Sequence, residues 1–340
     1  MVKVRYQDLS GDDRRDAMEV AGRSSGHQAH LLEKDVWVVA TLSVLFDAPF
    51  AGHLTFKGGT SLSKVWRAIQ RFSEDVDITY DIRAFAPDLV SGAGDEALPP
   101  TRSQEKSWTR AIRSRLVEWV REEACPFVAE GIARIGFVGK VRAEADSLFV
   151  NYEPLFEQAS FVRPEVKVEF GARSTGEPHK KVPIACDAAP YLPDLVFPQA
   201  SPNTMLAERT FWEKATAVHV YCCQERRRGE RMSRHWHDLS RLDRAGIAAS
   251  ALTDRELAIS VARHKAIFFS EKDARGGWID YEEAVSGDLQ LVPFGTARTV
   301  LADDYAKMLG AGMLLDENEP FDVLMERCAS LEACANGSEA

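Results

Sequence analysis

The sequence has no long hydrophobic run, no signal-peptide core at its N-terminus and few cysteines. No apolar stretch approaches the roughly 20 residues that a membrane-spanning helix needs. The six cysteines are scattered over 340 residues without a Cys-x-x-Cys pair, although Cys222 and Cys223 are adjacent. Their spacing indicates neither a zinc site nor a disulfide framework. The composition therefore predicts a cytoplasmic protein whose cysteines are reduced.

An excess of positive charge is also absent, because the formal net charge is −10. This charge argues against a protein that coats nucleic acid non-specifically, but it leaves RNA open as a substrate. Arginines gather locally, and such patches can guide a polyanion on an acidic protein. The alternative for each patch is a solvated helix face. The two groups are Arg110, Arg113 and Arg115, and then Arg226, Arg227, Arg228, Arg231 and Arg234.

The chain is long enough for a large core and two subdomains. A proline-rich connection between residues 178 and 202 marks the boundary. We expect a domain of residues 1–200 with an N-terminal helical cover, and a mainly helical domain of residues 201–340. Hydrophobic periodicity predicts helices over about 30–46, 61–70, 107–125 and 254–269, and strands over 75–80, 132–141, 147–152, 166–170 and 289–293.

A glycine pair lies between an apolar segment and a helical pattern. Leu54 and Phe56 are typical of a strand, and a helical pattern begins at Ser61. Gly58 and Gly59 free the backbone for a tight turn, and the N-terminus of the helix that follows favours an anion. The segment therefore predicts a phosphate site; an ordinary turn is the alternative.

Two aspartates follow on a predicted strand. The run DVDITY at 75–80 alternates polar and apolar residues, so Asp75 and Asp77 project from the same face. Two carboxylates on one rigid face can hold a hard cation such as Mg²⁺, although a solvated strand end is the alternative. Together with the glycine turn, the pair supplies what nucleotidyl transfer needs, because metal ions bridge triphosphate oxygens and activate the attacking hydroxyl.

The segments FKGGTSLSK at 56–64 and RFSEDVD at 71–77 resemble the AbiEii/AbiGii toxin family. Its members are the nucleotidyltransferase-like toxins of AbiE- and MenT-type toxin–antitoxin systems. Three further segments, at 163–170, 210–219 and 232–239, fit the order of the family's motifs. The resemblance covers about residues 30–240. It implies an α/β, DNA-polymerase-β-like nucleotidyltransferase fold with a small mixed sheet and a helical C-terminal subdomain.

The resemblance also implies roles for residues of the first two motifs. The glycine turn would lie near the triphosphate of the NTP substrate, and the aspartates would bind Mg²⁺ or Mn²⁺. Lys167 is a candidate for nucleotide contact, and Glu169 would be a third metal carboxylate or a base for the acceptor hydroxyl. An exposed edge strand with alternating charge is the alternative for both. The turn comprises Gly58, Gly59, Thr60 and Ser61, and the metal pair is Asp75 and Asp77.

The last two motifs lie in the C-terminal domain. Lys214 matches a lysine that would reach the triphosphate, with a helix-surface salt bridge as the alternative. Asp238 would lie near the nucleotide or orient that lysine. The family often carries tyrosine where this chain has Trp236 and His237, so we assign no catalytic role to His237. A His-x-His metal site and an HD-type phosphohydrolase lack further ligands at suitable spacing.

The implied activity is transfer of a nucleoside monophosphate from an NTP to an acceptor hydroxyl. By resemblance the acceptor is the 3′ end of tRNA, which would block aminoacylation and translation. The implied partner is an AbiEi-like antitoxin with a winged helix-turn-helix. Two alternatives remain: nucleotidylation of a protein or small molecule, and a non-catalytic sensor that binds NTP.

The charged triplet Glu33-Lys34-Asp35 resembles one found ahead of the glycine turn in this family.

Overall fold

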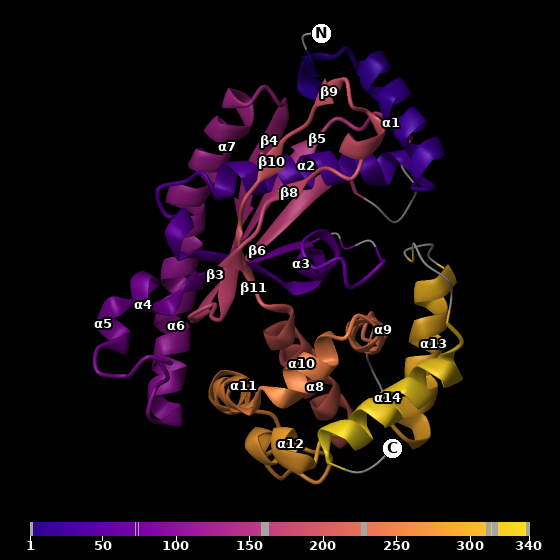
Figure 1. Ribbon diagram of the computed structural model, residues 1–340. Coiled ribbons are helices and arrows are strands. Elements are labelled where there is room, and N and C mark those ends of the chain that lie inside the picture. Colours follow the sequence, from indigo (N-terminus) through magenta and orange to yellow (C-terminus); the bar gives the residue numbers. More distant parts are fainter. Residues whose placement is uncertain are drawn as a thin grey trace. The chain divides into compact units, whose positions relative to one another are not determined.

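The computed structural model describes residues 3–71, 73, 75–157, 163–225, 230–310, 314 and 319–337. The chain forms two compact units, one built on a sheet and one helical (Figure 1). The expected domains of residues 1–200 and 201–340 stay a prediction. The first unit comprises Met1–Val65, Phe72–Pro87 and Arg110–Thr204, and the second comprises Trp66–Arg71, Asp88–Thr109 and Met205–Ala340.

A seven-stranded mixed sheet with strand order β4-β5-β6-β3-β2-β11-β7 forms the centre of the first unit (Figure 1). Strands β3 and β6 run parallel, as do β2 and β11, whereas β4–β5, β5–β6 and β2–β3 are antiparallel. The expected α/β class with a mixed sheet is confirmed. The bounds are β2 Leu54–Lys57, β3 Asp75–Asp81, β4 Gly139–Glu144, β5 Ser147–Tyr152, β6 Glu165–Ser174, β7 His179–Lys181 and β11 Asn203–Met205.

Two short ladders accompany this sheet. Strand β1 (Val4–Arg5) pairs in parallel with β9 (Leu195–Val196), and β8 (Ile184–Ala185) pairs antiparallel with β10 (Gln199–Ala200).

The alternating sequences of β3 and β6 give the central sheet one apolar and one charged face. Val76 lies opposite Val168 and Ile78 opposite Phe170, and all four side chains are buried. The residues between them point to the other face. Because β6 lies between β5 and β3, the alternative of an exposed edge strand is wrong.

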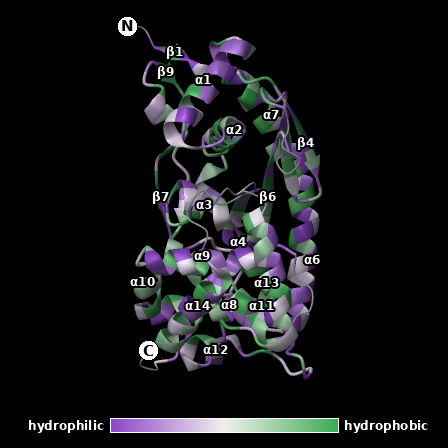
Figure 2. Ribbon diagram, turned by 90° about the vertical axis from the view of Figure 1, so that its right-hand side faces the viewer, coloured by the Kyte–Doolittle hydropathy of each residue, from purple (hydrophilic) through white to green (hydrophobic). Residues whose placement is uncertain are grey.

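Helices cover the apolar face. The ring of Trp37 in α2 (Ala29–Leu45) stacks on Tyr152 of β5 with the ring centroids 4.7 Å apart, and Trp119 meets Phe170 edge-to-face at 5.2 Å. Helix α2 is buried along most of its length, and Figure 2 draws it largely in green. The helices of this unit are α1 Gly11–Ser25, α2 Ala29–Leu45, α3 Gly58–Lys64, α4 Ile82–Phe85, α6 Arg102–Trp119 and α7 Cys125–Arg134, with a π-helix at Val120–Ala124 between α6 and α7.

The structure corrects two expectations for this unit. The strand expected over 132–141 begins only at Gly139, because the apolar pattern of α7 continues to Arg134. There Gly131 packs so closely on α2 that an added Cβ would lie 2.2 Å from a methyl carbon of Val44. The helix expected over 61–70 is α3, which begins at Gly58 and ends at Lys64.

Glu33 of α2 provides a pH-dependent contribution to stability. Its side chain is buried and accepts a hydrogen bond of 3.0 Å from the backbone N–H of Leu155. Burial raises the pKa of Glu33 to about 7. The unfolded value is about 4.3, so the protonated form stabilises the fold, and this contribution is lost as the pH rises from about 4.3 to about 7.

We therefore expect Glu33→Gln to stabilise the protein relative to wild type at alkaline pH. The gain in free energy of unfolding is roughly 1–3 kcal/mol larger at pH 8.5 than at pH 5, because the neutral amide has no charge to bury. Urea unfolding of both proteins at the two pH values measures this difference. An equal difference in free energy of unfolding between the two proteins at both pH values would contradict the prediction.

The second unit is helical. Its helix α8 (Ala207–Cys223) buries Phe211, Trp212, Ala215 and Val218, and the indole N–H of Trp212 donates to the carbonyl of Ala251 at 3.0 Å. The helices are α5 Pro87–Val90, the start of α6, α8 Ala207–Cys223, α9 Ser233–Arg244, α10 Ile247–Thr253, α11 Arg255–Phe268, α12 Tyr281–Gly287, α13 Gly295–Gly310 and α14 Phe321–Ala335.

The strand expected over 289–293 is wrong. The carbonyl of Leu291 accepts the indole N–H of Trp236 at 2.7 Å, and the carboxylate of Glu332 accepts the backbone N–H groups of Leu291 and Val292. Side chains thus satisfy the backbone N–H and carbonyl groups of this apolar segment, as a strand partner would otherwise do.

Arg226, Arg227 and Arg228 lie outside the described residues, as do Phe72 and Glu74 of the RFSEDVD segment. None of the described helices is both long and apolar enough to cross a membrane.

Candidate nucleotide and metal site

The charged face of the sheet brings the predicted aspartates beside the residues predicted on β6. Asp75 lies opposite Lys167, and Asp77 lies opposite Glu169 on one side and Lys57 of β2 on the other. These pairings follow from the parallel register of β3 and β6 and the antiparallel register of β2 and β3. The polar residues of the segments 71–77 and 163–170 therefore form one continuous surface, although the two segments are far apart in the sequence.

The glycine turn packs directly on this surface. Gly58 is the first residue of α3, and its φ of 77° lies in the left-handed region that favours glycine. A Cβ at Gly58 would lie 2.0 Å from Oδ2 of Asp77, so a glycine is also required by space. The turn and the Asp77 carboxylate are therefore in van der Waals contact.

The hydroxyl groups of the turn bind backbone carbonyls nearby. Thr60 Oγ1 donates to the carbonyl of Asp75, and Ser61 Oγ donates to the carbonyl of Gly58 at 2.8 Å. Thr60 thereby ties α3 to the strand that carries both aspartates. Gly59 lies in the first turn of the same helix, so all four predicted residues of the turn belong to α3.

Gly58→Ala is expected to destabilise the protein by about 2 kcal/mol, because the left-handed φ is unfavourable for alanine and its methyl group would push the Asp77 carboxylate away. Urea unfolding measures the loss. Gly92→Ala is the matched control: Gly92 has a φ of 85° but no atom within 4 Å of an added Cβ. The control should lose only the part of the stability that comes from φ, about 1 kcal/mol. Equal losses would show that contact with Asp77 contributes nothing.

Lys167 and Glu169 form an ion pair along β6. The hydrogen bond from the ammonium group to Glu169 raises the pKa of Lys167, so the lysine is charged at neutral pH. Both side chains remain partly exposed, at 33% and 43% of their full area. The pair places one positive and one negative charge beside the aspartates, and solvent reaches both.

The oxygen donors on β3 fit a magnesium ion. Mg²⁺ in proteins is held by one or two carboxylates, with waters and substrate phosphates completing its coordination. Asp75 and Asp77 supply two such carboxylates on one face. Across the described parts of the chain, no three Asp, Glu, His or Cys side chains are grouped so as to hold a metal ion by themselves. These two carboxylates are the residues that could hold such an ion.

The second unit contains a buried cluster of the other predicted residues. Lys214 of α8 lies 2.9 Å from Oδ2 of Asp238 of α9, whose side chain is fully buried. Arg71 binds the same carboxylate in bidentate fashion, with distances of 2.7 Å from Nε to Oδ1 and 2.8 Å from Nη2 to Oδ2. Lys214 is thus held by a helix other than its own, and the alternative of a helix-surface salt bridge is wrong.

Electrostatics fix the charge of Asp238. Burial disfavours its carboxylate, but Arg71 and Lys214 outweigh burial and hold the pKa of Asp238 well below its usual range. The neighbouring His237 is also fully buried, with Nδ1 at 3.4 Å from Oδ1 of Asp238. Burial lowers the pKa of His235 well below its usual value, and the positive charge of Lys214 lowers it further. The imidazole is therefore neutral.

Arg71 is the residue whose role the sequence did not reveal. It opens the RFSEDVD segment, and it follows Ala68 and Ile69, which are buried. A single arginine beside buried apolar residues was a usable signal, since a buried guanidinium needs a carboxylate partner. Its partner, Asp238, could not be identified from spacing.

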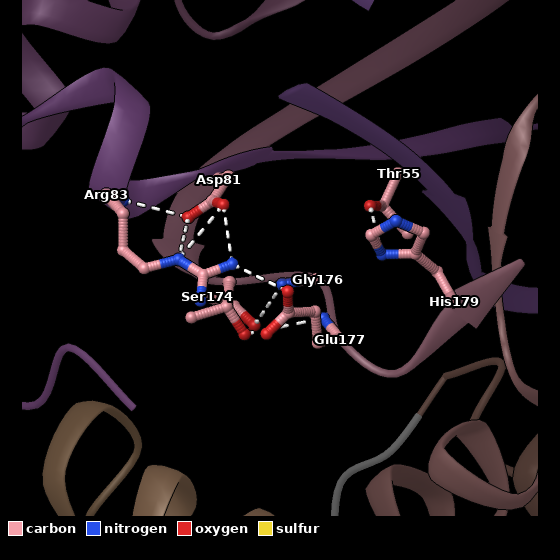
Figure 3. Close-up of polar contacts among 8 residues, drawn as sticks. Thr55, Asp81, Arg83, Ser174, Gly176, Glu177 and His179 are labelled. Carbon is pink, nitrogen blue, oxygen red and sulfur yellow. Dashed lines mark hydrogen bonds and ion pairs between the residues drawn. The ribbon is translucent and has the colours of Figure 1, made fainter. Parts of the chain in front are cut away.

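The opposite end of β3 carries a separate polar cluster (Figure 3). Nη2 of Arg83 lies 2.8 Å from Oδ2 of Asp81 and 2.8 Å from Oε1 of Glu177. In the same region Oγ1 of Thr55 lies 3.5 Å from Nδ1 of His179. These contacts join β2 and β3 to the segment that follows β6, and they serve the fold.

Two of three comparisons with known proteins found a match. The family model described as "Nucleotidyl transferase AbiEii toxin, Type IV TA system" matches residues 41–327. No curated protein matches the sequence. Among solved structures, the chain is similar to MenT4, a nucleotidyltransferase toxin from Mycobacterium tuberculosis H37Rv. That likeness has a TM-score of 0.49 and 16% sequence identity, and it covers 95% of this chain and 90% of that one.

Proposed function

This chain belongs to the AbiEii family of nucleotidyltransferase toxins, which act in toxin–antitoxin systems, and on that premise we propose that it transfers a nucleoside monophosphate from an NTP to the 3′ end of tRNA. One observation carries the proposal of a transfer site. The glycine turn contacts Asp77 on a sheet face where Asp75 and Asp77 lie opposite Lys167 and Glu169. The proposed phosphate-binding turn therefore lies directly beside the carboxylate pair.

Asp75 and Asp77 hold Mg²⁺ or Mn²⁺ in this proposal. When bound, the cation supplies positive charge to the triphosphate oxygens and to the attacking hydroxyl. The backbone N–H groups of Gly59, Thr60 and Ser61, at the start of α3, bind phosphate oxygens. Gly58 allows this backbone to lie against Asp77, so the phosphate and metal sites are adjacent.

Lys167 and Glu169 act on the two partners of the reaction. The ammonium group of Lys167 neutralises phosphate charge, which grows on the leaving pyrophosphate. Glu169 accepts the proton of the acceptor hydroxyl as it attacks the α-phosphorus in line. Their mutual ion pair supports the role of Lys167, because it keeps this lysine charged before the substrates arrive.

Lys214 and Asp238 enter the proposal from the sequence motifs. Lys214 contacts the triphosphate, and Asp238 orients that lysine. Their 2.9 Å ion pair supports the second role, since a lysine held by a buried carboxylate has few conformations left. Arg71 binds the same carboxylate, so the negative charge of Asp238 is shared by two cations.

Exposed cations support RNA as the acceptor. Arg110 and Arg113 are exposed on α6 and can contact phosphates of an RNA backbone. The partner in the cell is an antitoxin of AbiEi type with a winged helix-turn-helix, and the reaction takes place in the cytoplasm.

A transfer assay tests the proposal. The purified protein is incubated with Mg²⁺, each of the four α-labelled NTPs and either total tRNA or ribosome-free cell protein. We expect label in tRNA, released as a single terminal nucleotide on 3′ digestion. Label found only in protein would refute the RNA acceptor, and no label with any NTP and either acceptor would refute nucleotidyl transfer.

A further inference from the structure

Three consecutive charged residues of α2, Glu33, Lys34 and Asp35, are buried. Asp35 belongs to an ion cluster that the transfer site does not include. Its Oδ1 lies 2.6 Å from Nζ of Lys64, the last residue of α3, and Asp187 Oδ1 lies 2.9 Å from the same nitrogen. The side chains of Asp35 and Lys64 are only 8% and 7% exposed, so water screens this contact little.

The cluster satisfies the lysine completely. The ammonium group has three hydrogens, and its third acceptor is the carbonyl of Ala185 at 3.0 Å. Asp35 in turn accepts the backbone N–H of Asp187 at 2.7 Å. Lys64 is therefore fixed from three directions, and the cluster joins α2, α3 and the segment after β8.

Helix α3 depends on contacts at both of its ends. It has seven residues, about 10 Å in length, and a helix this short has little stability of its own. Its first turn places Gly58 against Asp77 and Thr60 against the carbonyl of Asp75. Its last residue is Lys64. A displacement of Lys64 would therefore move the opposite end, where the glycine turn meets the aspartates.

We propose that Asp35 and Asp187 are positioning residues: they hold Lys64, and through α3 they keep the glycine turn in place against Asp75 and Asp77. This inference rests on the proposed transfer function, because it gives the turn its catalytic meaning. It also accounts for the aspartate of the Glu33-Lys34-Asp35 triplet, which the transfer site leaves without a role.

The test compares Asp35→Asn with Val44→Ala. Asparagine keeps the shape of Asp35 and removes its charge. Val44 lies on the same helix, is also buried and packs on Gly131 of α7, so Val44→Ala destabilises the unit by removing apolar contacts and leaves the ion cluster intact. Hydrogen exchange of the amides of residues 62–65 reports the anchoring of α3, and transfer at saturating NTP and tRNA reports kcat.

We expect Asp35→Asn to speed exchange in residues 62–65 at least about tenfold more than in β5, and to lower kcat about 10- to 100-fold. Val44→Ala should change exchange in both elements alike and keep kcat within about threefold of wild type. The inference is overturned if Asp35→Asn affects α3 no more than β5, or if kcat stays at the wild-type value.

Asp187→Asn keeps the inference testable if Asp35→Asn does not fold. The Asp187 side chain is 30% exposed, so its loss should be tolerated, with the same local exchange in α3 and a smaller loss of kcat. Unchanged exchange in α3 in that variant would overturn the inference. The exchange measurement needs no substrate. A wild-type protein that transfers no nucleotide would refute the proposed function, whereas failure of the anchoring would appear in the exchange data.

Discussion

Asp77→Asn is expected to lower the rate of nucleotide transfer at least about a thousandfold while the free energy of unfolding stays within about 1 kcal/mol of wild type. Asparagine fills the same space beside Gly58, so the turn is retained. In the proposed function this carboxylate charge holds the cation, which in turn binds the triphosphate, and the substitution removes it. Single-turnover transfer of labelled NMP, with urea unfolding in parallel, separates the two effects.

Asp81→Asn is the matched control for this prediction. Asp81 ends the same strand, and its carboxylate contacts Arg83 away from the proposed site (Figure 3). The same chemical change there should leave the transfer rate within about threefold of wild type. If Asp77→Asn keeps more than a tenth of the wild-type transfer rate, Asp77 is not a metal ligand in the reaction.

Growth arrest in cells separates catalysis from binding. If the protein acts only by binding NTP, an Asp75→Ala variant that no longer transfers nucleotide would still arrest growth fully. In the proposed function, arrest disappears together with transfer.

Asp238→Ala is expected to destabilise the protein by about 3–5 kcal/mol. The change leaves the buried cations Arg71 and Lys214 without the carboxylate that both contact. Asp243→Ala is the control: Asp243 lies on the same helix, is 37% exposed and contacts Arg327 at 3.9 Å, so its loss should cost less than about 1 kcal/mol. Urea unfolding at pH 7 measures both.

The pH dependence of stability gives a second measure of the Asp238 cluster. The pKa of Asp238 is lowered in the folded protein, so its charge stabilises the fold above the unfolded value of about 3.9, and this contribution is lost as the pH falls below that value. Asp238→Ala lacks the contribution at every pH. The stability difference between the two proteins should therefore shrink on acidification below about pH 4; a constant difference would contradict the assigned pairing.

The sequence predicted which residues share a face of β3 and of β6, because alternation along a strand is a local signal. Alternation along β3 and β6 placed Asp75, Asp77, Lys167 and Glu169 on the charged faces of their strands. The pairing of these strands could not be predicted, because a register between distant segments depends on the packing of the whole sheet. For the same reason the partner of Arg71 was missed, and the segment 289–293 was interpreted as a strand although Glu332 satisfies its backbone.

The pairing of β3 with β6 also has a consequence for how the protein is made. Asp75 and Asp77 leave the ribosome well before Lys167 and Glu169, and Asp187 follows later still. Contacts between such distant segments form late in folding, because a long loop must close first. A nascent chain that ends before Glu165 lacks β6 and therefore Lys167 and Glu169, which lie opposite the aspartates in the complete sheet. Synthesis of the toxin thus passes through a long stage in which the polypeptide already carries Asp75 and Asp77 but lacks the strand that lies beside them.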